Sequence, residues 1–93
     1  MNKYETIFIV DSELTEEART PVIERFKNLI ESNGQIETIE EWGSRRLAYP
    51  VKDKLEGYYV LVGYGAPPNF PIELERVFKI TDSILKFLTI RKE

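Results

Sequence analysis

The segment Trp42-Gly-Ser-Arg-Arg-Leu-Ala-Tyr-Pro50 is the one around which the rest of the chain is organised. Its residues are typical of a β-strand, and neighbouring strand residues point to opposite faces of a sheet, so Arg45 and Arg46 cannot both lie against a core. In a regular strand, Trp42 shares the face of Arg46. Glycine inside a strand commonly marks a bulge, however, and a bulge at Gly43 reverses this assignment. At least one of the two arginines therefore faces a partner or water.

The strand that contains this segment is predicted to run from Gln35 to Val51, because apolar and polar residues alternate along its first half. Pro50 cannot donate a backbone hydrogen bond, which favours an edge position in the sheet. The residues Asp-Lys-Leu-Glu-Gly at 53–57 are typical of a turn, so we expect a hairpin. It leads into a strand over 58–64, Tyr-Tyr-Val-Leu-Val-Gly-Tyr, which is apolar on both faces.

Residues 3–10, Lys-Tyr-Glu-Thr-Ile-Phe-Ile-Val, predict another strand that is apolar on both faces, as is usual for a central strand. A helix is predicted over about 15–32 from apolar residues at helical spacing, with Thr15 as its N-cap. Pro21 lies inside this helix, where proline removes a hydrogen bond. We therefore expect an irregular first turn.

A second helix is predicted to follow Asn69, which serves as its cap, and a last strand is predicted over 84–90. The buried stripe of this helix consists of Phe70, Leu74, Val77 and Phe78. The resulting β-α-β-β-α-β order is that of the split β-α-β, or ferredoxin-like, plan. We expect an α+β fold over residues 1–93, with a four-stranded antiparallel sheet and both helices on one face.

The composition excludes several classes of function. The 93 residues are 42% hydrophobic and 31% charged, which is typical of one soluble domain. No apolar run reaches the roughly 18 residues of a membrane helix, and the N-terminus lacks the layout of a signal peptide, so we expect a cytosolic protein without a membrane segment. Cysteine and histidine are absent, which excludes disulfides and thiolate metal sites, and we expect no metal or other cofactor.

The acidic residues do not predict a catalytic site. Asp11 and Glu13 follow the first strand, where a phosphate-binding enzyme carries a glycine-rich loop, and carboxylates there repel phosphate. Glu40 and Glu41 point to opposite faces of a regular strand, so they do not form an acid/base pair. We interpret Glu40 and Glu41 as solvated carboxylates at a sheet edge. We therefore expect no enzymatic activity.

Charge is distributed unevenly along the chain. The net charge is −3, which by itself argues against a general nucleic-acid coat. Residues 1–41 hold four basic and ten acidic residues, whereas residues 42–93 hold nine basic and six acidic residues. This asymmetry allows contact with a local anionic partner despite the acidic total.

Two helices cover only one face of such a sheet, so the other face is expected to expose apolar side chains. The candidates for this patch are Ile7, Ile9, Tyr59, Leu61, Leu85 and Phe87, and the sequence leaves open which of them belong to which face. A large patch of this kind usually marks a protein partner or a platform on which bases stack. Aromatic residues at ordinary strand positions, covered by long side chains and loops, are the alternative.

Arginine beside aromatic residues suits phosphate contact and stacking. Two solvated charges that discourage edge-to-edge aggregation are the alternative. The strand over 58–64 lacks the interleaved basic residues of sheet faces that stack RNA bases. We therefore expect a protein on the sheet face, and RNA at an edge or end that is contacted by Lys3, Arg45, Arg46 and Lys86.

Several segments together form a recognisable pattern: Lys3-Tyr-Glu5, Ile23-Glu-Arg-Phe26, Ser32-Asn-Gly34, Trp42-Gly-Ser-Arg-Arg-Leu-Ala-Tyr49, Glu56-Gly-Tyr58 and Lys79-Ile-Thr-Asp82. Over essentially its whole length the chain resembles the bacterial small-subunit ribosomal protein six family. The resemblance implies a ferredoxin-like, RRM-like protein of the ribosome without a catalytic role. It also implies binding to ribosomal RNA of the small-subunit central domain together with small-subunit protein eighteen. In the family the two proteins associate first, and a basic partner would offset the net charge of −3.

The resemblance also implies roles for individual residues. Arg45 and Arg46 match the paired arginines of the family, and Lys3 matches its basic N-terminal position, which makes them RNA or partner contacts. Tyr4, Trp42 and Tyr49 are expected to be structural or partner-facing, and Tyr59 and Leu61 of the apolar patch are expected to contact the partner. Near the last strand, where the family often has several arginines, this chain offers Lys79, Thr81, Leu85 and Lys86, which implies weaker RNA contact there.

Two other classes of function remain open. A ferredoxin-like enzyme or ligand-binding regulatory module requires a concave pocket with convergent polar groups. A self-associating protein-interaction module would use the open sheet face or the edge strand. We expect the isolated chain to be monomeric, which would count against the second class.

Overall fold

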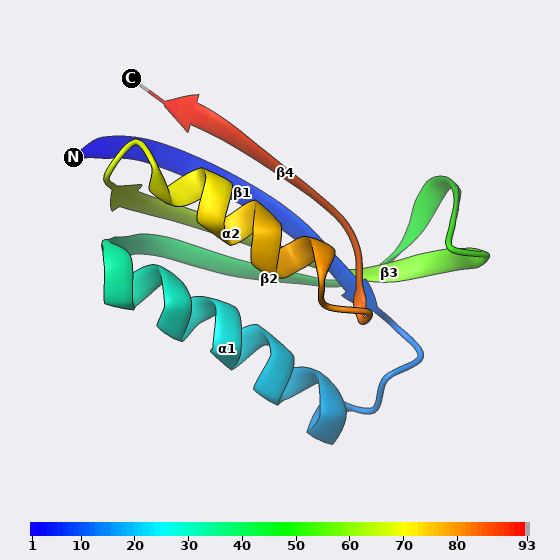
Figure 1. Cartoon of the computed structure of the whole chain (residues 1–93). Helices are drawn as coiled ribbons and strands as arrows, with labels where there is room; N and C mark the ends of the chain where they lie inside the picture. The colour runs from blue at the N-terminus through cyan, green and yellow to red at the C-terminus, as the bar shows by residue number, and fades with distance from the viewer. Residues whose placement is uncertain (93) are drawn as a thin grey trace.

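The computed structural model describes residues 1–92, which form one sheet with two helices on the same side of it (Figure 1). The elements in chain order are β1 (Asn2–Asp11), α1 (Glu16–Asn33), β2 (Gln35–Val51), β3 (Lys54–Ala66), α2 (Phe70–Lys79) and β4 (Ile84–Lys92). All strand pairs are antiparallel, and the strand order is β2-β3-β1-β4. The expected ferredoxin-like α+β fold is confirmed.

β1 and β3 lie in the middle of the sheet because both of their faces are apolar. Side chains of alternate residues on each strand face the helices and form the main core, in which Phe8, Phe26 and Phe78 meet with ring centroids 4.4 to 5.5 Å apart. The predicted stripe of α2 is buried as expected, at Phe70, Leu74, Val77 and Phe78. Aromatic packing between the sheet and both helices therefore holds the two layers together.

The main core contains one buried polar pair. The hydroxyl groups of Thr6 on β1 and Tyr64 on β3 lie 2.8 Å apart, and Thr6 is also 2.8 Å from the Thr89 hydroxyl on β4. Burial raises the pKa of Tyr64 above its ordinary value, because the phenolate is disfavoured in the apolar interior. Thr6 thus provides the Tyr64 hydroxyl with a hydrogen-bond partner away from water.

The helix termini agree with the prediction at α1 and differ at α2. The Thr15 hydroxyl accepts a hydrogen bond from the Ala18 amide, as an N-cap does. α1 runs through Pro21 as a helix from Glu16, and both Pro21 and Glu17 are exposed, so water can reach the carbonyl that proline leaves unpaired. The prediction that Asn69 caps α2 was wrong, because its side chain makes no capping hydrogen bond.

β2 lies at the sheet edge, as Pro50 predicts, and the turn after it is shorter than expected. Lys52 and Asp53 have φ angles of 51° and 65°, and Val51 pairs with Lys54. Two consecutive residues with positive φ make a tight hairpin turn, so β3 begins at Lys54 and not at Tyr58. Figure 1 shows this hairpin as the part of the molecule that projects beyond the two layers.

The buried hydroxyl pair generates a prediction about stability. Thr6→Val should lower the free energy of unfolding by about 1–3 kcal/mol, because the Tyr64 hydroxyl then stays in the core without its partner. Tyr64→Phe should lower the free energy of unfolding by less. In a chain that already carries Tyr64→Phe, the further change Thr6→Val should lower it only slightly. Urea denaturation of the two single variants and the double variant measures this coupling. Additive costs would show that the hydrogen bond contributes nothing.

Candidate protein and nucleic-acid interface

The face of the sheet that points away from the helices is the candidate site, and we call it the open face. Its apolar centre consists of Ile7 from β1, Trp42 from β2, Tyr59 and Leu61 from β3, and Leu88 and Ile90 from β4. Trp42 is 40% exposed, Ile90 47% and Leu88 58%. Exposure of several large apolar side chains side by side marks an interaction surface.

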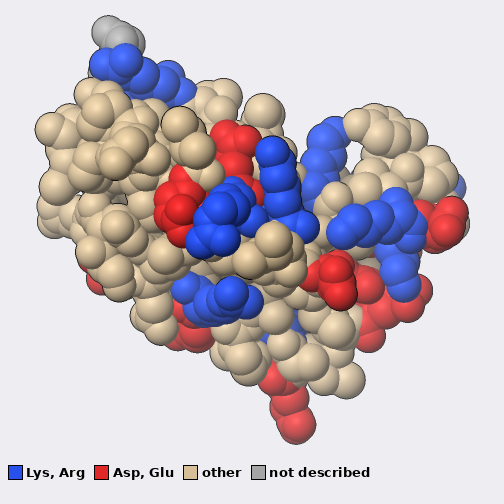
Figure 2. Space-filling model, in the orientation of Figure 1, with Lys and Arg blue, Asp and Glu red and all other residues tan. Residues whose placement is uncertain are grey.

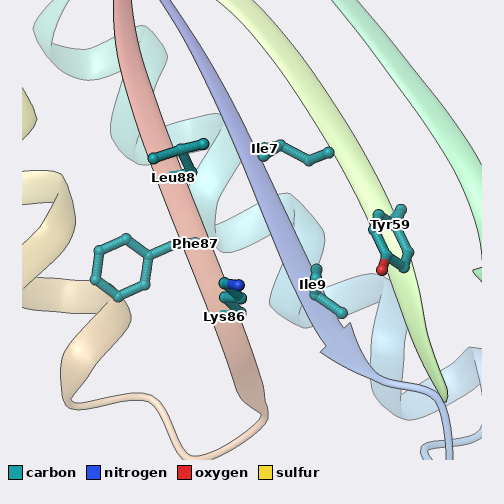
Figure 3. A pocket seen from close by; sticks show the side chains of 6 residues that line it. All are labelled: Ile7, Ile9, Tyr59, Lys86, Phe87 and Leu88. Atoms are coloured by element: carbon teal, nitrogen blue, oxygen red, sulfur yellow. The ribbon is translucent and has the colours of Figure 1, made fainter. Parts of the chain in front are cut away.

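The sequence predicted part of this face correctly. Ile7, Tyr59 and Leu61 lie on it as expected. Phe87 was assigned wrongly, because it lies on the helix side and stacks on Phe78 with ring centroids 5.1 Å apart. Figure 3 shows Phe87 pointing away from Ile7 and from its own neighbour Leu88.

Two β4 residues of the open face, Leu88 and Ile90, were missed from the sequence. Leu88 and Ile90 lie on the face of β4 opposite to that of Phe87. They were missed because the alternation of side chains along a strand does not tell which of its faces the helices cover. Ile9 and Leu85 lie on the open side, but both are buried with Leu47 in a second, small core. The segment that follows Leu47 therefore covers one end of the open face.

A bulge at Gly43 decides which arginine reaches the open face. Gly43 has a φ of 82°, and the pairing of β2 with β3 shifts between Glu41 and Gly43. As a result the Arg45 guanidinium lies 5.6 Å from the centre of the Trp42 ring, which itself stacks on Tyr59 at 6.2 Å and 12°. The assignment for a regular strand, with Trp42 beside Arg46, was wrong, and the bulged alternative is confirmed.

Lys86 and Tyr49 join Arg45 at the same end of the open face. Lys86 pairs with Ile9 in the sheet, and its ammonium group donates a hydrogen bond of 2.5 Å to the Tyr49 hydroxyl. The same nitrogen lies 4.8 Å from the centre of the Tyr49 ring. We call the group of Trp42, Arg45, Tyr49 and Lys86 the basic end. Two cations beside two exposed aromatic rings suit contact with phosphate and with bases.

Two other predicted cations lie elsewhere. Lys3 is six residues from Ile9 along β1, which corresponds to about 20 Å, and its ammonium group lies 3.3 Å from the Glu37 carboxylate. Arg46 is opposite Glu56 in the hairpin, so it points to the other side from Arg45. The structure therefore places Arg45 and Lys86 on the two edge strands at the same end of the open face, and separates them from Lys3 and Arg46.

Tyr4 is not available to a partner. It is only 7% exposed, and its ring lies in the main core beside Tyr64, with centroids 5.8 Å apart. Of the two roles expected for Tyr4, structural or partner-facing, its position on the face that the helices cover supports the structural one. The other predicted partner residues, Trp42, Tyr49, Tyr59 and Leu61, are exposed or partly exposed.

Lys54, at the start of β3, is already paired with carboxylates of this chain. Lys54 lies 2.6 Å from Glu13 and 3.6 Å from Asp11. The hydrogen bond to Glu13, followed by the charge of Asp11, raises the pKa of the Lys54 amine above its ordinary value. Its charge is therefore balanced within the chain, whereas Arg45 and Lys86 are both exposed and contact aromatic rings.

The open face is hollowed but does not enclose a ligand site. Two adjacent hollows of about 210 Å³ each share Ile7 and Leu88 in their lining. Pockets for small ligands are usually about 300–1,000 Å³ and contain several convergent polar groups. Here the charged residues in the linings are Lys86 in one hollow and Glu5 in the other, and Figure 3 shows the first. An apolar surface of this shape suits a macromolecular partner better.

Two features typical of other classes of protein are absent from residues 1–92. None of the helices in this range is both long and apolar enough to cross a membrane. The same range contains no group of three or more Asp, Glu, His or Cys side chains placed to hold a metal ion.

Comparison with known proteins identifies relatives over the whole chain. Residues 3–91 match the family model described as ribosomal protein S6. The small ribosomal subunit protein bS6 of Caldanaerobacter subterraneus is 50% identical, and that of Clostridium novyi is 48% identical; each match covers 100% of this chain and 99% of the relative. The crystal structure of 30S ribosomal protein S6 from Thermotoga maritima has a TM-score of 0.92 at 32% identity, covering 98% of this chain and 87% of that chain.

The bulge at Gly43 generates a prediction about the basic end. Gly43→Val should lower the free energy of unfolding by about 1–3 kcal/mol, because a β-branched residue is strained at a φ of 82°. It should also change the fluorescence of Trp42, the single tryptophan, because the Trp42 ring then loses its contacts with Arg45 and Tyr59. Gly43→Asn should be milder, since asparagine tolerates positive φ.

Gly65→Ala is the matched control for this experiment. Gly65 does not have positive φ, and an added methyl group would meet its nearest neighbour at 3.5 Å, an ordinary contact. Equal effects of Gly43→Val and Gly65→Ala on stability and fluorescence would contradict a specific role for the bulge.

Proposed function

This chain belongs to the ribosomal protein S6 family, and from this premise we propose that it binds central-domain ribosomal RNA of the small subunit together with small-subunit protein eighteen. Membership of the family makes it a ribosomal protein of the small subunit. The relatives are ribosomal proteins and not enzymes, so the expectation of a non-catalytic protein is confirmed.

The observation that carries the proposal is the composition of the open face. Its apolar centre, with Trp42, Leu88 and Ile90 exposed, fits a protein surface. The basic end, with Arg45 and Lys86 beside aromatic rings, fits RNA at the margin of that protein contact. Protein eighteen would thus cover the centre, and RNA would contact the basic end.

The charge of the chain supports a requirement for the partner. The net charge is −3, and basic and acidic side chains are interspersed on the helix side of the molecule (Figure 2). RNA affinity depends mainly on how many phosphates are neutralised. The two accessible cations at the basic end can neutralise only a few phosphates. A basic partner would therefore have to neutralise the others.

The four proposed RNA contacts are therefore not equivalent. Arg45 and Lys86 lie at the same end of the open face and can contact one RNA segment. Lys3 is balanced by Glu37 at the opposite end, and Arg46 lies on the other side of the hairpin. We assign the main contacts to Arg45 and Lys86, and auxiliary contacts to Lys3 and Arg46.

Arg45→Ala tests the RNA contact. In the presence of protein eighteen, it should weaken binding to a central-domain RNA fragment about tenfold, and it should reduce the slope of log K against log salt by about 0.7–0.9. Arg25→Ala is the matched control, because Arg25 is exposed on α1, away from the open face. Filter binding across a salt series measures both quantities.

Three outcomes of this experiment would count against the proposal. The wild-type chain should bind the fragment tightly only when protein eighteen is present, and tight binding without it would remove the need for a partner. An unchanged salt slope in Arg45→Ala would show that Arg45 does not contact phosphate. Equal losses in Arg25→Ala would point to a general charge effect.

Leu88→Asp tests the partner contact. Leu88 is 58% exposed, so the fold should tolerate aspartate, but burial of this charge under protein eighteen should weaken the pairing at least tenfold. Ile72→Asp is the matched control, because Ile72 is 73% exposed on α2. Calorimetric titration without RNA measures the affinity. If both variants pair normally, protein eighteen does not cover the open face.

A further inference from the structure

The two hollows of the open face form one trough along β1. Ile7 forms its floor, Leu88 and Ile90 form the β4 side, and Tyr59 and Leu61 form the β3 side. β3 and β4 flank β1, so the sides are two strand spacings, about 10 Å, apart. An α-helix with its side chains is about 10–12 Å across. The width of the trough therefore matches one helix.

The length of the trough also suits a short helix. It extends from Glu5 to Ile9, where the segment that follows Leu47 covers the sheet. Four residues of a strand span about 13 Å, which corresponds to about nine residues of an α-helix. An apolar stripe at positions i, i+3 or i+4, and i+7 on such a helix would contact the floor and both sides.

An extended segment or RNA fits the trough less well than a helix. A strand laid on the apolar floor would leave backbone N–H and C=O groups without partners, whereas a helix satisfies them internally. RNA would bring phosphates near the carboxylates of Glu5, Glu37 and Glu40.

The two ends of the trough differ in charge. Lys86 and Arg45 lie at the covered end, where Lys86 pairs with Ile9 and Arg45 lies over Trp42. At the other end, two carboxylates face two amines: Lys3 lies 3.3 Å from Glu37, and Lys92 lies 3.5 Å from Glu5. Glu40, which accepts a hydrogen bond from Trp42, lies opposite Leu61 near the middle of the trough. The trough is therefore positive at the covered end and balanced in charge at the other.

We propose that this trough binds one amphipathic helix of the protein partner, with the C-terminus of that helix directed toward Lys86, which stays open to RNA on its other side, and its N-terminus near Glu5. The dipole of a helix places partial negative charge at its C-terminus and partial positive charge at its N-terminus, which matches the polarity of the trough. This inference rests on the proposed function, because protein eighteen is the partner that supplies the helix.

Spin labels test the orientation. The chain contains no cysteine, so Ala48→Cys and Thr38→Cys provide unique attachment sites that leave the charged residues in place. Ala48 is exposed beside Lys86 at the covered end, and Thr38 is exposed opposite Gly63 near the other end. Ile72→Cys on α2 is the matched control away from the trough.

Each label is attached in turn and broadens the NMR signals of nearby amides in isotope-labelled protein eighteen. The label at position 48 should broaden the C-terminal end of one helix, and the label at position 38 should broaden the N-terminal end of the same helix. The label at position 72 should broaden neither. The reverse order, or broadening of a non-helical segment, would overturn the inference while leaving the proposed function intact.

Charge reversal provides a second measurement. Lys86→Glu should weaken pairing with protein eighteen in the absence of RNA about two- to fivefold, as expected when one charge at a helix terminus is lost, and the loss should shrink at high salt. Arg25→Glu on α1 should leave the pairing unchanged. Unaltered pairing by Lys86→Glu would contradict the proposed polarity, and absence of pairing by the wild-type chain would remove the proposed function as well.

Discussion

The constraint on which the structure depends is that two helices cover only one face of a four-stranded sheet. β1 and β3 are apolar on both faces, so covering one face leaves the other with exposed apolar side chains. The covered face gains its stability from packing among the aromatic rings of Phe8, Phe26 and Phe78. The other face also holds large apolar residues, and no helix or strand within residues 1–92 lies over its centre, which makes it the natural surface for a partner.

The hairpin between β2 and β3 divides this surface. Leu47 turns back to pack on Ile9 and Leu85, and the Lys52 ammonium group donates a hydrogen bond of 3.1 Å to the Ile84 carbonyl on the far strand. One end of the open face is thereby covered by the chain itself. The segment that covers it also carries Tyr49 to Lys86, so a local packing arrangement creates the basic end beside the apolar trough.

Much of the fold could be predicted because its signals are local. Thr15 marks the start of α1, the stripe that begins at Phe70 identifies α2, and Pro50 places β2 at an edge, each from a few neighbouring residues. The failures have equally physical causes. The Asn69 cap was expected from residue type alone, and the turn at Lys52 and Asp53 was missed because positive φ was expected of neither residue.

The sequence by itself determined the element order, the two central strands and the presence of an uncovered apolar face, because periodicity and residue type act over short distances. The tertiary structure decided the composition of that face. A one-residue bulge at Gly43 places Arg45 on the open face, and the pairing of distant strands brings Lys86 to Tyr49. Because strand side chains alternate with a period of two, a single shift in register exchanges the faces. Gly43 indicated where such a shift could occur, but only the pairing of β2 with β3 decides that it does.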